Sequence, residues 1–470
     1  MQGKGVIVID IGKALAKVTL WDAARTLIAR ETRPNQRIDC GAYTGLDIDG
    51  IDDWLGSVLA DFAKRENVGA IVPVAHGAAA VLIRDEQVVV PPMDYETAIP
   101  AEVLNAYRAR RAGFTETGSP ALPDGLNLGA LLHWLEALQP QAFENALILP
   151  WGQYWAWRLS GVAATEVTAL GCHSDLWNPT TGSPSSLAVD AGWADHFPPL
   201  RGAGDVLGSL TPDWIARTGL PANTRVHCGI HDSNAALMAA RGFAEIAGHE
   251  ATVLSTGTWF VAMRTPDKPI DLASLPEARD CLVNVDAFGT AIPSARFMGG
   301  REIETLTGVD ARRIDIRPDQ PALLACVEEI VARGTMVLPT YALGFGPFPD
   351  SKGRWIDMPD DWFARRAAVC LYAALVADVA LDLIGARATI LIEGRFAEAE
   401  VFTRALASLR PNDAIYTSHA HNDVSFGALR LLDPDLKPSA TLDRVAPLDL
   451  DLSVYRARWH EALSMMQDAA

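Results

Sequence analysis

The first residues with the chemistry to hold a phosphate group lie close together near the start of the sequence. Asp10 ends an apolar run, Gly12 follows it, and Lys13 and Lys17 come next. Glycine lets backbone N–H groups approach phosphate oxygens closely, and lysines supply positive charge. A carboxylate such as that of Asp10 can orient a hydrated Mg²⁺ ion. An ordinary hairpin with a surface lysine has the same pattern, so this motif alone leaves both interpretations open.

A second candidate phosphate-binding segment spans residues 255–259. It places Thr256, Gly257 and Thr258 between two apolar runs. The N–H and hydroxyl donors of such a turn suit the β- and γ-phosphates of a nucleotide. A plain hairpin turn is the alternative.

The third candidate is the carboxylate of Asp232. It follows a predicted strand at 225–228 and precedes a predicted helix at 233–240. Beside an alcohol, this carboxylate would act as a general base that takes the hydroxyl proton during phosphoryl transfer. An aspartate in this position also caps a helix by accepting hydrogen bonds from its first N–H groups. The sequence leaves base and cap as competing roles for one side chain.

The elements that must position these groups alternate between strands and helices. Apolar residues alternate or run continuously at 6–11, 17–21, 27–32 and 70–75, and they fall at helical spacing over 51–66. These spans predict the order βββαβ. A related order follows later in the chain, with strands at 250–255, 259–263 and 282–285, a buried helix at 364–384, a strand at 389–393 and a helix at 398–409. Two copies of a βββαβα unit are the signature of the α/β fold shared by actin, hexokinase and heat-shock ATPases.

The chain has 470 residues, which is too many for one hydrophobic core. The helix at 233–240 ends near Gly242, and a new strand system begins near residue 250. We therefore expect two domains, 1–242 and 243–470. Further helices are predicted at 424–432 and 455–467.

Net charge, cysteine content and the lengths of the apolar runs limit which partners the protein can bind and in which compartment it is expected. The net charge of −18 argues against a broad electrostatic grip on nucleic acid or on an anionic membrane. Six scattered cysteines match neither the usual zinc spacings nor a disulfide framework. The first apolar run is too short for a signal peptide, and the run at 367–385 contains two aspartates, which favours a buried helix over a membrane span. We expect a cytoplasmic protein.

In their order along the chain, these segments resemble the FGGY family of carbohydrate kinases. Residues 10–17 resemble the family's first phosphate motif, and residues 147–176 resemble a conserved stretch whose core here reads Trp-Arg-Leu-Ser-Gly. Residues 206–222 are similar to the run that leads to the catalytic aspartate, here Asp232, and residues 255–259 are similar to the second phosphate motif. The resemblance covers nearly the whole chain. It implies two ribonuclease H-like domains of the actin and hexokinase type, with an interdomain cleft.

The resemblance also implies a sugar site in the first domain. Residues 74–77 are similar to a family segment whose histidine contacts the sugar, which selects His76 and Gly77. Residues 92–96 are similar to the next loop, which selects Asp94, and His173 lies on a loop expected to face the same pocket. A polyol needs several such partners because each buried hydroxyl left unpaired is costly. A satisfied core histidine remains the alternative for His76, as does a surface loop residue for His173.

On the adenine side the sequence departs from the family pattern. Residues 392–397 stand where the family usually has a glycine triplet, and only Gly394 keeps the expected type. Arg395 is predicted to stack on the base or to pair with phosphate, with a surface salt bridge as the alternative. Gly427, with the alanine that follows it, resembles the family's glycine–alanine pair on the other side of the nucleotide. Lys13 also stands where a hydroxyl residue is commoner, so the nucleotide preference stays open.

The function implied by the resemblance is an ATP-dependent sugar kinase that uses ATP and Mg²⁺. Residues 171–173 and 393–396 are most similar to the rhamnulose and fuculose kinase branch, with xylulose or ribulose as alternatives. A non-catalytic sugar and nucleotide sensor, and a hydrolase of ATP or phosphosugars, are the rival interpretations. We expect a small sugar as the partner and neither nucleic acid nor membrane. The oligomeric state is left open, with a homodimer as one outcome.

Overall fold

The computed structural model describes residues 3–310, 314–418 and 424–467. The chain divides into two compact units. Unit 1 comprises Met1–Gly242, Val283–Ala291 and Asn422–Leu436, and unit 2 comprises Phe243–Leu282, Ile292–His421 and Lys437–Ala470. Two segments that the sequence assigned to the second domain, 283–291 and 422–436, thus pack with unit 1. The predicted crevice between the domains stays a prediction.

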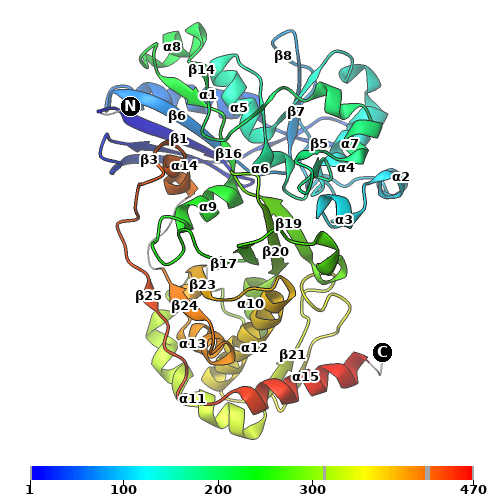
Figure 1. Cartoon of the computed structure of the whole chain (residues 1–470), viewed down its shortest axis with the longest axis vertical. Coiled ribbons are helices and arrows are strands. Elements are labelled where there is room, and N and C mark those ends of the chain that lie inside the picture. The colour runs from blue at the N-terminus through cyan, green and yellow to red at the C-terminus, as the bar shows by residue number, and fades with distance from the viewer. Residues whose placement is uncertain (1–2, 311–313, 419–423, 468–470) are drawn as a thin grey trace. The chain divides into compact units, whose positions relative to one another are not determined.

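Unit 1 is built on a mixed sheet whose central strand is β1 (Gly5–Ile11). β1 is antiparallel to β2 (Leu15–Trp21) and parallel to β6 (Val68–Ala75), and β3 (Leu27–Pro34) lies at the edge beyond β2 (Figure 1). Alternate residues of β1 enter two apolar clusters, one with α1 (Ile48–Phe62) and the other with α9 (Asp232–Ala240) and α14 (Val424–Leu432). A strand buried on both faces explains the continuous apolar run in the sequence.

One short hairpin in unit 1 was missed by the prediction from sequence. Strands β4 (Arg37–Asp39) and β5 (Thr44–Leu46) pair between β3 and α1. Strands of three residues are too short to show a periodic pattern. Helix α1 also begins three residues before the predicted start at residue 51, because Asp47 caps it by accepting a hydrogen bond from the Gly50 N–H.

The remaining elements of unit 1 include further strands of this sheet, smaller separate sheets and helices. They are β7 (Ala80–Arg84), β8 (Gln87–Val88), α2 (Ala101–Arg110), α3 (Phe114–Thr117), α4 (Leu128–Leu138), β9 (Leu147–Pro150), α5 (Trp151–Ser160), β10 (Thr165–Glu166), α6 (Val167–Leu170), β11 (Trp177–Asn178), β12 (Ser183–Pro184), α7 (Ser186–Asp190), β13 (Leu200–Arg201), β14 (Val206–Ser209), α8 (Pro212–Thr218), β15 (Arg225–His227) and β16 (Ile230–His231).

Unit 2 repeats the connectivity of unit 1. Its central strand β17 (Ala251–Thr256) is antiparallel to β18 (Phe260–Thr265) and parallel to β23 (Thr389–Gly394), as β1 is to β2 and β6. β18 in turn pairs antiparallel with β20 (Ala291–Phe297), a strand absent from the prediction. The duplicated α/β topology expected from the sequence is therefore confirmed.

The other elements of the second half of the chain include further strands of this sheet, a separate two-stranded sheet and helices. They are β19 (Cys281–Val285), whose residues from Val283 on belong to unit 1, α10 (Gly299–Thr307), α11 (Gln320–Arg333), β21 (Met336–Leu338), β22 (Arg354–Ile356), α12 (Trp362–Leu383), α13 (Glu400–Leu409), β24 (Ala414–Thr417), β25 (Asp443–Arg444) and α15 (Ser453–Gln467).

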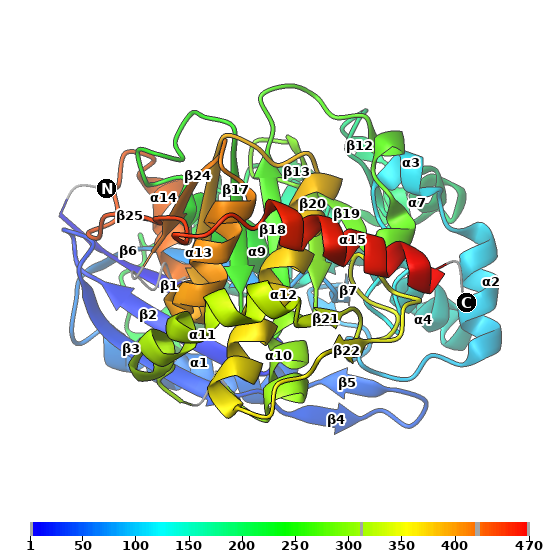
Figure 2. The same cartoon turned by 90° about the horizontal axis from the view of Figure 1, so that it is seen from below.

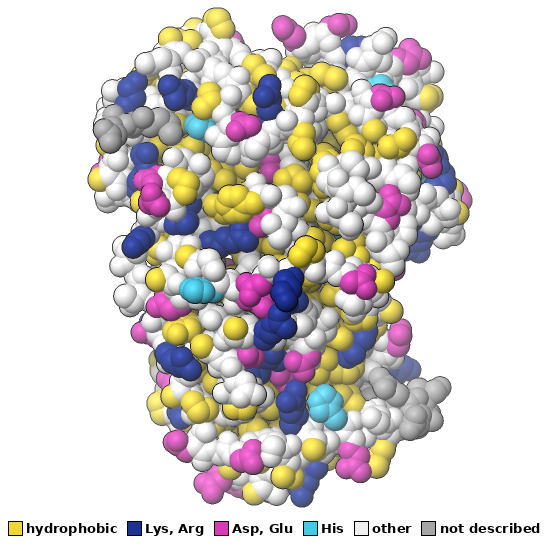
Figure 3. Space-filling model, viewed as in Figure 1, with side chains coloured by type: hydrophobic (Ala, Val, Ile, Leu, Met, Phe, Trp, Pro, Cys, Tyr) yellow, Lys and Arg dark blue, Asp and Glu magenta, His cyan; other side chains and the backbone are white. Residues whose placement is uncertain are grey.

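Helix α12 is the buried helix predicted at 364–384. It packs against α10, α11 and α13, and Figure 2 shows α12 between α11 and α10. In the part of the chain that the structure describes, no helix is long and apolar enough to span a membrane. On the face drawn in Figure 3, acidic and basic side chains are interspersed.

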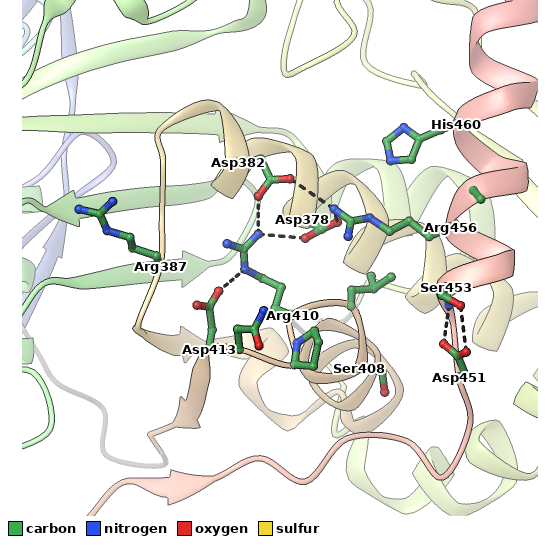
Figure 4. A pocket seen from close by; sticks show the side chains of 14 residues that line it. Asp378, Asp382, Arg387, Ser408, Arg410, Asp413, Asp451, Ser453, Arg456 and His460 are labelled. Carbon is green, nitrogen blue, oxygen red and sulfur yellow. Dashed lines mark hydrogen bonds and ion pairs between the residues drawn. The ribbon is translucent and has the colours of Figure 1, made fainter.

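The C-terminal helix α15 is joined to the rest of unit 2 by ion pairs around a pocket of about 760 Å³ (Figure 4). Arg410 is 8% exposed and pairs with Asp378 at 2.9 Å and with Asp413 at 2.7 Å. Arg456, on α15, pairs with the other oxygen of Asp378 at 2.6 Å. The two arginines thus connect α12, α15 and the segment after α13 through shared carboxylates.

Candidate active site

Three neighbouring parallel strands of unit 1 end at the same edge of the sheet. Ile11 of β1 is in register with Ala75 of β6, and Ala75 is in register with His231 of β16. Asp10 therefore lies one residue before this edge, while His76 and Asp232 each lie one residue beyond it. The carboxyl ends of parallel strands are the usual place for a binding site in α/β sheets.

Asp10 and Lys17 face each other across the antiparallel pair β1 and β2. They occupy the same register position, and the Lys17 Nζ lies 3.0 Å from the Asp10 Oδ2. The charge of Lys17 also lowers the pKa of Asp232, so the ammonium group lies near both carboxylates. Gly12 forms the turn between the two strands, where its N–H donates to the Leu15 carbonyl oxygen at 3.1 Å.

Asp232 does not cap helix α9. It is the first helical residue, the N-cap is His231, and no side chain caps the helix. The Asp232 Oδ1 accepts hydrogen bonds from its neighbour Ser233, through the backbone N–H at 2.6 Å and the hydroxyl at 3.3 Å. Although 31% of the side-chain surface is exposed, the packed protein around the carboxyl raises its pKa to about 6. Asp232 is thus not the N-cap residue, although its carboxylate accepts a hydrogen bond from one N–H of the first turn.

Lys13 and Asp94, both predicted site residues, form an ion pair with each other. Asp94 is 1% exposed and also lies 3.0 Å from the Arg37 Nε. The Lys13 ammonium sits 4.4 Å from the centre of the Tyr95 ring. Burial, with the charges of Glu96, Asp94 and Asp232, raises the pKa of Tyr95 to about 12, so this phenol lies near Asp232. Arg37 and Tyr95 had no predicted role, and no spacing in the sequence relates Arg37 to Asp94.

His76 is held between two aromatic rings. Its ring centre lies 5.5 Å from that of Tyr95 and 6.3 Å from that of Trp151. Burial, followed by the charge of Lys13, lowers the pKa of His76 to about 3, so this imidazole is neutral. Its Nδ1 is buried and makes no hydrogen bond with any residue that the structure describes.

Gly77 and His173 complete the predicted sugar-side residues. A Cβ atom at Gly77 would lie 1.9 Å from the Cys172 Sγ, so no side chain fits there. His173 has a positive φ of 34°, and its Nδ1 lies 2.7 Å from the Leu126 carbonyl oxygen. Electrostatic interactions of His76 with both Lys13 and His173 show that these residues share one neighbourhood.

In unit 2, the parallel strands β17 and β23 end together at Thr256 and Gly394. The Thr256 hydroxyl donates to the Glu393 carbonyl oxygen at 2.6 Å and accepts from the Phe396 N–H at 3.0 Å. Gly394 has a φ of 85°, and a Cβ atom there would lie 2.2 Å from the Thr256 carbonyl oxygen. Both residues are thus needed to join the two strand ends, whatever they bind.

The other predicted phosphate and nucleotide residues lie in both units. Gly257 closes the turn after β17, where its N–H donates to the Trp259 carbonyl oxygen at 3.0 Å, and the half-buried Thr258 lies in the same turn. Arg395 pairs with Glu398 at 2.7 Å, as in the salt-bridge alternative. Gly427 belongs to unit 1, in α14, where a Cβ atom would lie 1.7 Å from the Ala235 carbonyl oxygen of α9.

The carboxylate of Asp10 in unit 1 suits Mg²⁺ that binds together with the phosphates of a substrate. Among the described residues, no group of three His, Cys, Asp or Glu side chains is arranged to hold a metal ion. Mg²⁺ is commonly bound through one or two carboxylates, several waters and the phosphates of a substrate. Asp10 matches this mode, because it offers a carboxylate beside a lysine that can also contact phosphate.

Comparison with known proteins shows the family of this chain. Residues 93–239 match the N-terminal domain of the FGGY family of carbohydrate kinases, and residues 248–440 match its C-terminal domain. The crystal structure of a carbohydrate kinase from Novosphingobium aromaticivorans is 56% identical and covers 99% of this chain and 100% of its own, with a TM-score of 0.96.

Two further relatives are more distant. The xylulose kinase of Rhodospirillum rubrum shares the fold, with a TM-score of 0.80 over 99% of both chains, at 17% identity. L-fuculokinase of Haemophilus influenzae is 35% identical over 135 residues, which are 28% of this chain and only 27% of that protein. The two matched domains, together with the likeness along the whole of the Novosphingobium protein, decide the family. This chain belongs to the FGGY family of carbohydrate kinases and is an ATP-dependent sugar kinase with the duplicated fold of actin and hexokinase.

Proposed function

We propose that this kinase phosphorylates a hydroxyl group of a small ketose, with Asp232 as the general base. The observation that carries the proposal is the position of Asp232 at the carboxyl edge of β16, β6 and β1, near the Lys17–Asp10 ion pair. A base, a cation and a metal-orienting carboxylate at one edge are the groups that phosphoryl transfer requires.

In the proposed reaction, Asp232 holds the sugar hydroxyl and takes its proton as the new O–P bond forms. Lys17 offsets the negative charge of the phosphates, and Asp10 orients the hydrated Mg²⁺. When bound with ATP, Mg²⁺ neutralises charge on the phosphate oxygens. Gly257 and Thr258 of unit 2 supply further donors to the phosphates, while the Thr256 hydroxyl shapes that turn through its bonds to β23. Gly394, Arg395 and Gly427 are proposed to border the nucleotide.

The sugar side of the proposal rests on the neighbourhood of His76. The buried, neutral Nδ1 of His76 makes no hydrogen bond with the described residues, so a sugar hydroxyl would satisfy it. Asp94, Gly77 and His173 lie in the same neighbourhood. The likeness of part of the chain to L-fuculokinase supports a 6-deoxy ketose such as L-fuculose, and pentuloses are the alternative substrates.

A coupled assay of ADP release tests this function. The panel contains the ketoses L-fuculose, L-rhamnulose, D- and L-xylulose and ribulose, and a reaction without sugar. We expect sugar-dependent ADP release and a phosphorylated ketose by mass spectrometry, with Asp232→Asn at least about 100-fold slower. Asp53→Asn, at an 88% exposed side chain in the same unit, is the matched control and should keep full activity. ADP release without a phosphorylated sugar, or full activity of Asp232→Asn, contradicts the proposal.

A further inference from the structure

The side chain next to the proposed base has no assigned role, although it contacts that base directly. His231 is buried, and its Nε2 lies 3.1 Å from the Oδ1 of Asp232. Its only other side-chain contact among the described hydrogen bonds is with Asn234, whose Nδ2 lies 3.4 Å from the His231 Nδ1.

These two contacts define the protonation state of His231. Burial lowers the pKa of this imidazole to about 4, so the ring is neutral near pH 7. A neutral imidazole has one N–H donor and one acceptor nitrogen. The amide nitrogen of Asn234 can only donate, which makes Nδ1 the acceptor. The ring proton therefore resides on Nε2, the nitrogen that lies 3.1 Å from the Oδ1 of Asp232.

The backbone of His231 is fixed by a second set of hydrogen bonds. Its N–H donates to the Thr168 Oγ1 at 2.9 Å, and the Thr168 hydroxyl donates to the Glu166 Oε2 at 2.5 Å. Glu166 is fully buried, and the same oxygen also accepts from the backbone N–H groups of Thr168 and Ala169. A buried carboxylate at the start of α6 thus anchors the strand end that carries His231.

In Asp232, the neighbouring residues contact only one of the two carboxylate oxygens. Its Oδ1 accepts two hydrogen bonds from Ser233 and lies 3.1 Å from the His231 Nε2, whereas no hydrogen bond from the described residues ends on Oδ2. Because Ser233 holds Oδ1 and the His231 ring faces the same oxygen, rotation of the carboxyl group is restricted. Oδ2 is then the atom presented to a substrate proton.

We propose that His231 is a positioning residue: through its Nε2–H it fixes the carboxyl group of Asp232 so that Oδ2 takes the proton of the sugar hydroxyl. This inference rests on the proposed role of Asp232 as base. Because the contact orients the base without touching the sugar, its loss is expected to lower kcat and to leave the sugar KM nearly unchanged.

Two substitutions of His231 separate orientation from packing. His231→Leu fills space without a donor, and we expect kcat to fall about 10- to 100-fold with the sugar KM changed less than about threefold. His231→Gln carries an amide donor at the position of Nε2, and we expect it to recover most of the lost kcat. The control is His227→Gln, at another buried histidine, whose Nδ1 contacts the Gly204 carbonyl oxygen and which should keep normal kcat.

The outcomes distinguish this inference from the proposed function. Wild-type kcat in His231→Leu, or an equal loss in the Leu and Gln variants, overturns the positioning role even if Asp232→Asn is inactive. Full activity of Asp232→Asn overturns the base itself.

The protonation state of His231 can also be measured in the wild-type protein, so this test does not depend on whether a variant folds. In wild-type protein labelled with ¹⁵N-histidine, we expect the His231 signals of a neutral ring protonated on Nε2 at pH 7, identified by their absence from His231→Gln or, if no variant is soluble, from their coupling to Asn234. A ring protonated on Nδ1, or on both nitrogens, overturns the inference.

Discussion

The ammonium group of Lys17 lies 3.0 Å from the carboxylate of Asp10, directly across the β1–β2 ladder. Both side chains are mostly buried, at 18% and 13% exposed, so the pair sits in a medium that screens charge less than water does. The pair therefore brings one positive and one negative group to the place where phosphate and Mg²⁺ are proposed to bind.

Replacing Lys17 with Met is expected to lower kcat by about 100-fold or more, because a preorganised charge that stabilises the transition state is lost. The KM for ATP should rise as well, since the proposed contact of Lys17 with the phosphates would also form in the ground state. Steady-state kinetics with varied ATP measure both effects. Lys64→Met, at an exposed lysine just after α1, is the control and should behave as wild type. A normal kcat in Lys17→Met would remove Lys17 from the site.

The pH dependence of kcat/KM follows from the raised pKa of Asp232, about 6. The base works only when ionised, so we expect the rate to be constant above about pH 7 and to fall about tenfold per pH unit well below pH 6. Its titration does not weaken the fold: a pKa above the ordinary 3.8 means that the folded state binds the proton more tightly, so this group adds stability as pH falls from 6 to 4. A flat profile from pH 5 to 8 would contradict the assignment.

Arg410 is expected to be critical for the stability of unit 2. Arg410→Ala leaves the buried carboxylates of Asp378 and Asp413 with fewer partners, at a cost of about 3–5 kcal/mol in the free energy of unfolding. Calorimetry or urea unfolding measures the change. The matched control is Arg354→Ala, at an exposed arginine of the same unit, for which we expect a change below about 0.5 kcal/mol. Equal stability of the two variants would show that the ion-pair network contributes little.

Gly394→Ala tests the close approach between β17 and β23. A Cβ atom there would meet the Thr256 carbonyl oxygen at 2.2 Å, and the φ of 85° is also unfavourable for alanine. Gly344 has nearly the same φ, 83°, but no atom within 4 Å of a Cβ, so Gly344→Ala isolates the backbone cost of about 1–2 kcal/mol. We expect Gly394→Ala to lose about 2 kcal/mol more than this control in urea unfolding. Equal losses would mean that the strand ends separate easily.

The strands and long helices were predictable because the spacing of apolar residues within each segment indicates which side chains are buried. The prediction for 424–432 coincides with α14, and that for 364–384 differs from α12 by two residues or fewer at each end. The helix-cap alternative for Asp232 was not decidable from sequence, since a cap differs from a first helical residue by one backbone position. Asp10, His76 and Asp232 meet only through the register of three strands, and register is a non-local property.

Contacts between side chains far apart in sequence were beyond the prediction for the same reason. His231 directly precedes Asp232 in the sequence, yet its proposed role depends on Thr168 and Asn234, which contact its backbone and its ring. Arg37 comes from a hairpin too short to be predicted, and it reaches Asp94 from there. The roles of the predicted sugar and nucleotide residues stay predictions.

Helix α14 packs in unit 1 although it follows most of unit 2 in the sequence, and this has a consequence for synthesis of the protein. The apolar cluster of Val6, Val8, Ala235 and Leu429 spans almost the whole chain, so unit 1 lacks part of its core until residue 436 has been made. At about 5–20 residues per second, roughly 10 to 40 s separate residue 242 from that point. Throughout this interval the apolar face of Val6, Val8 and Ala235 has no α14 to pack against it.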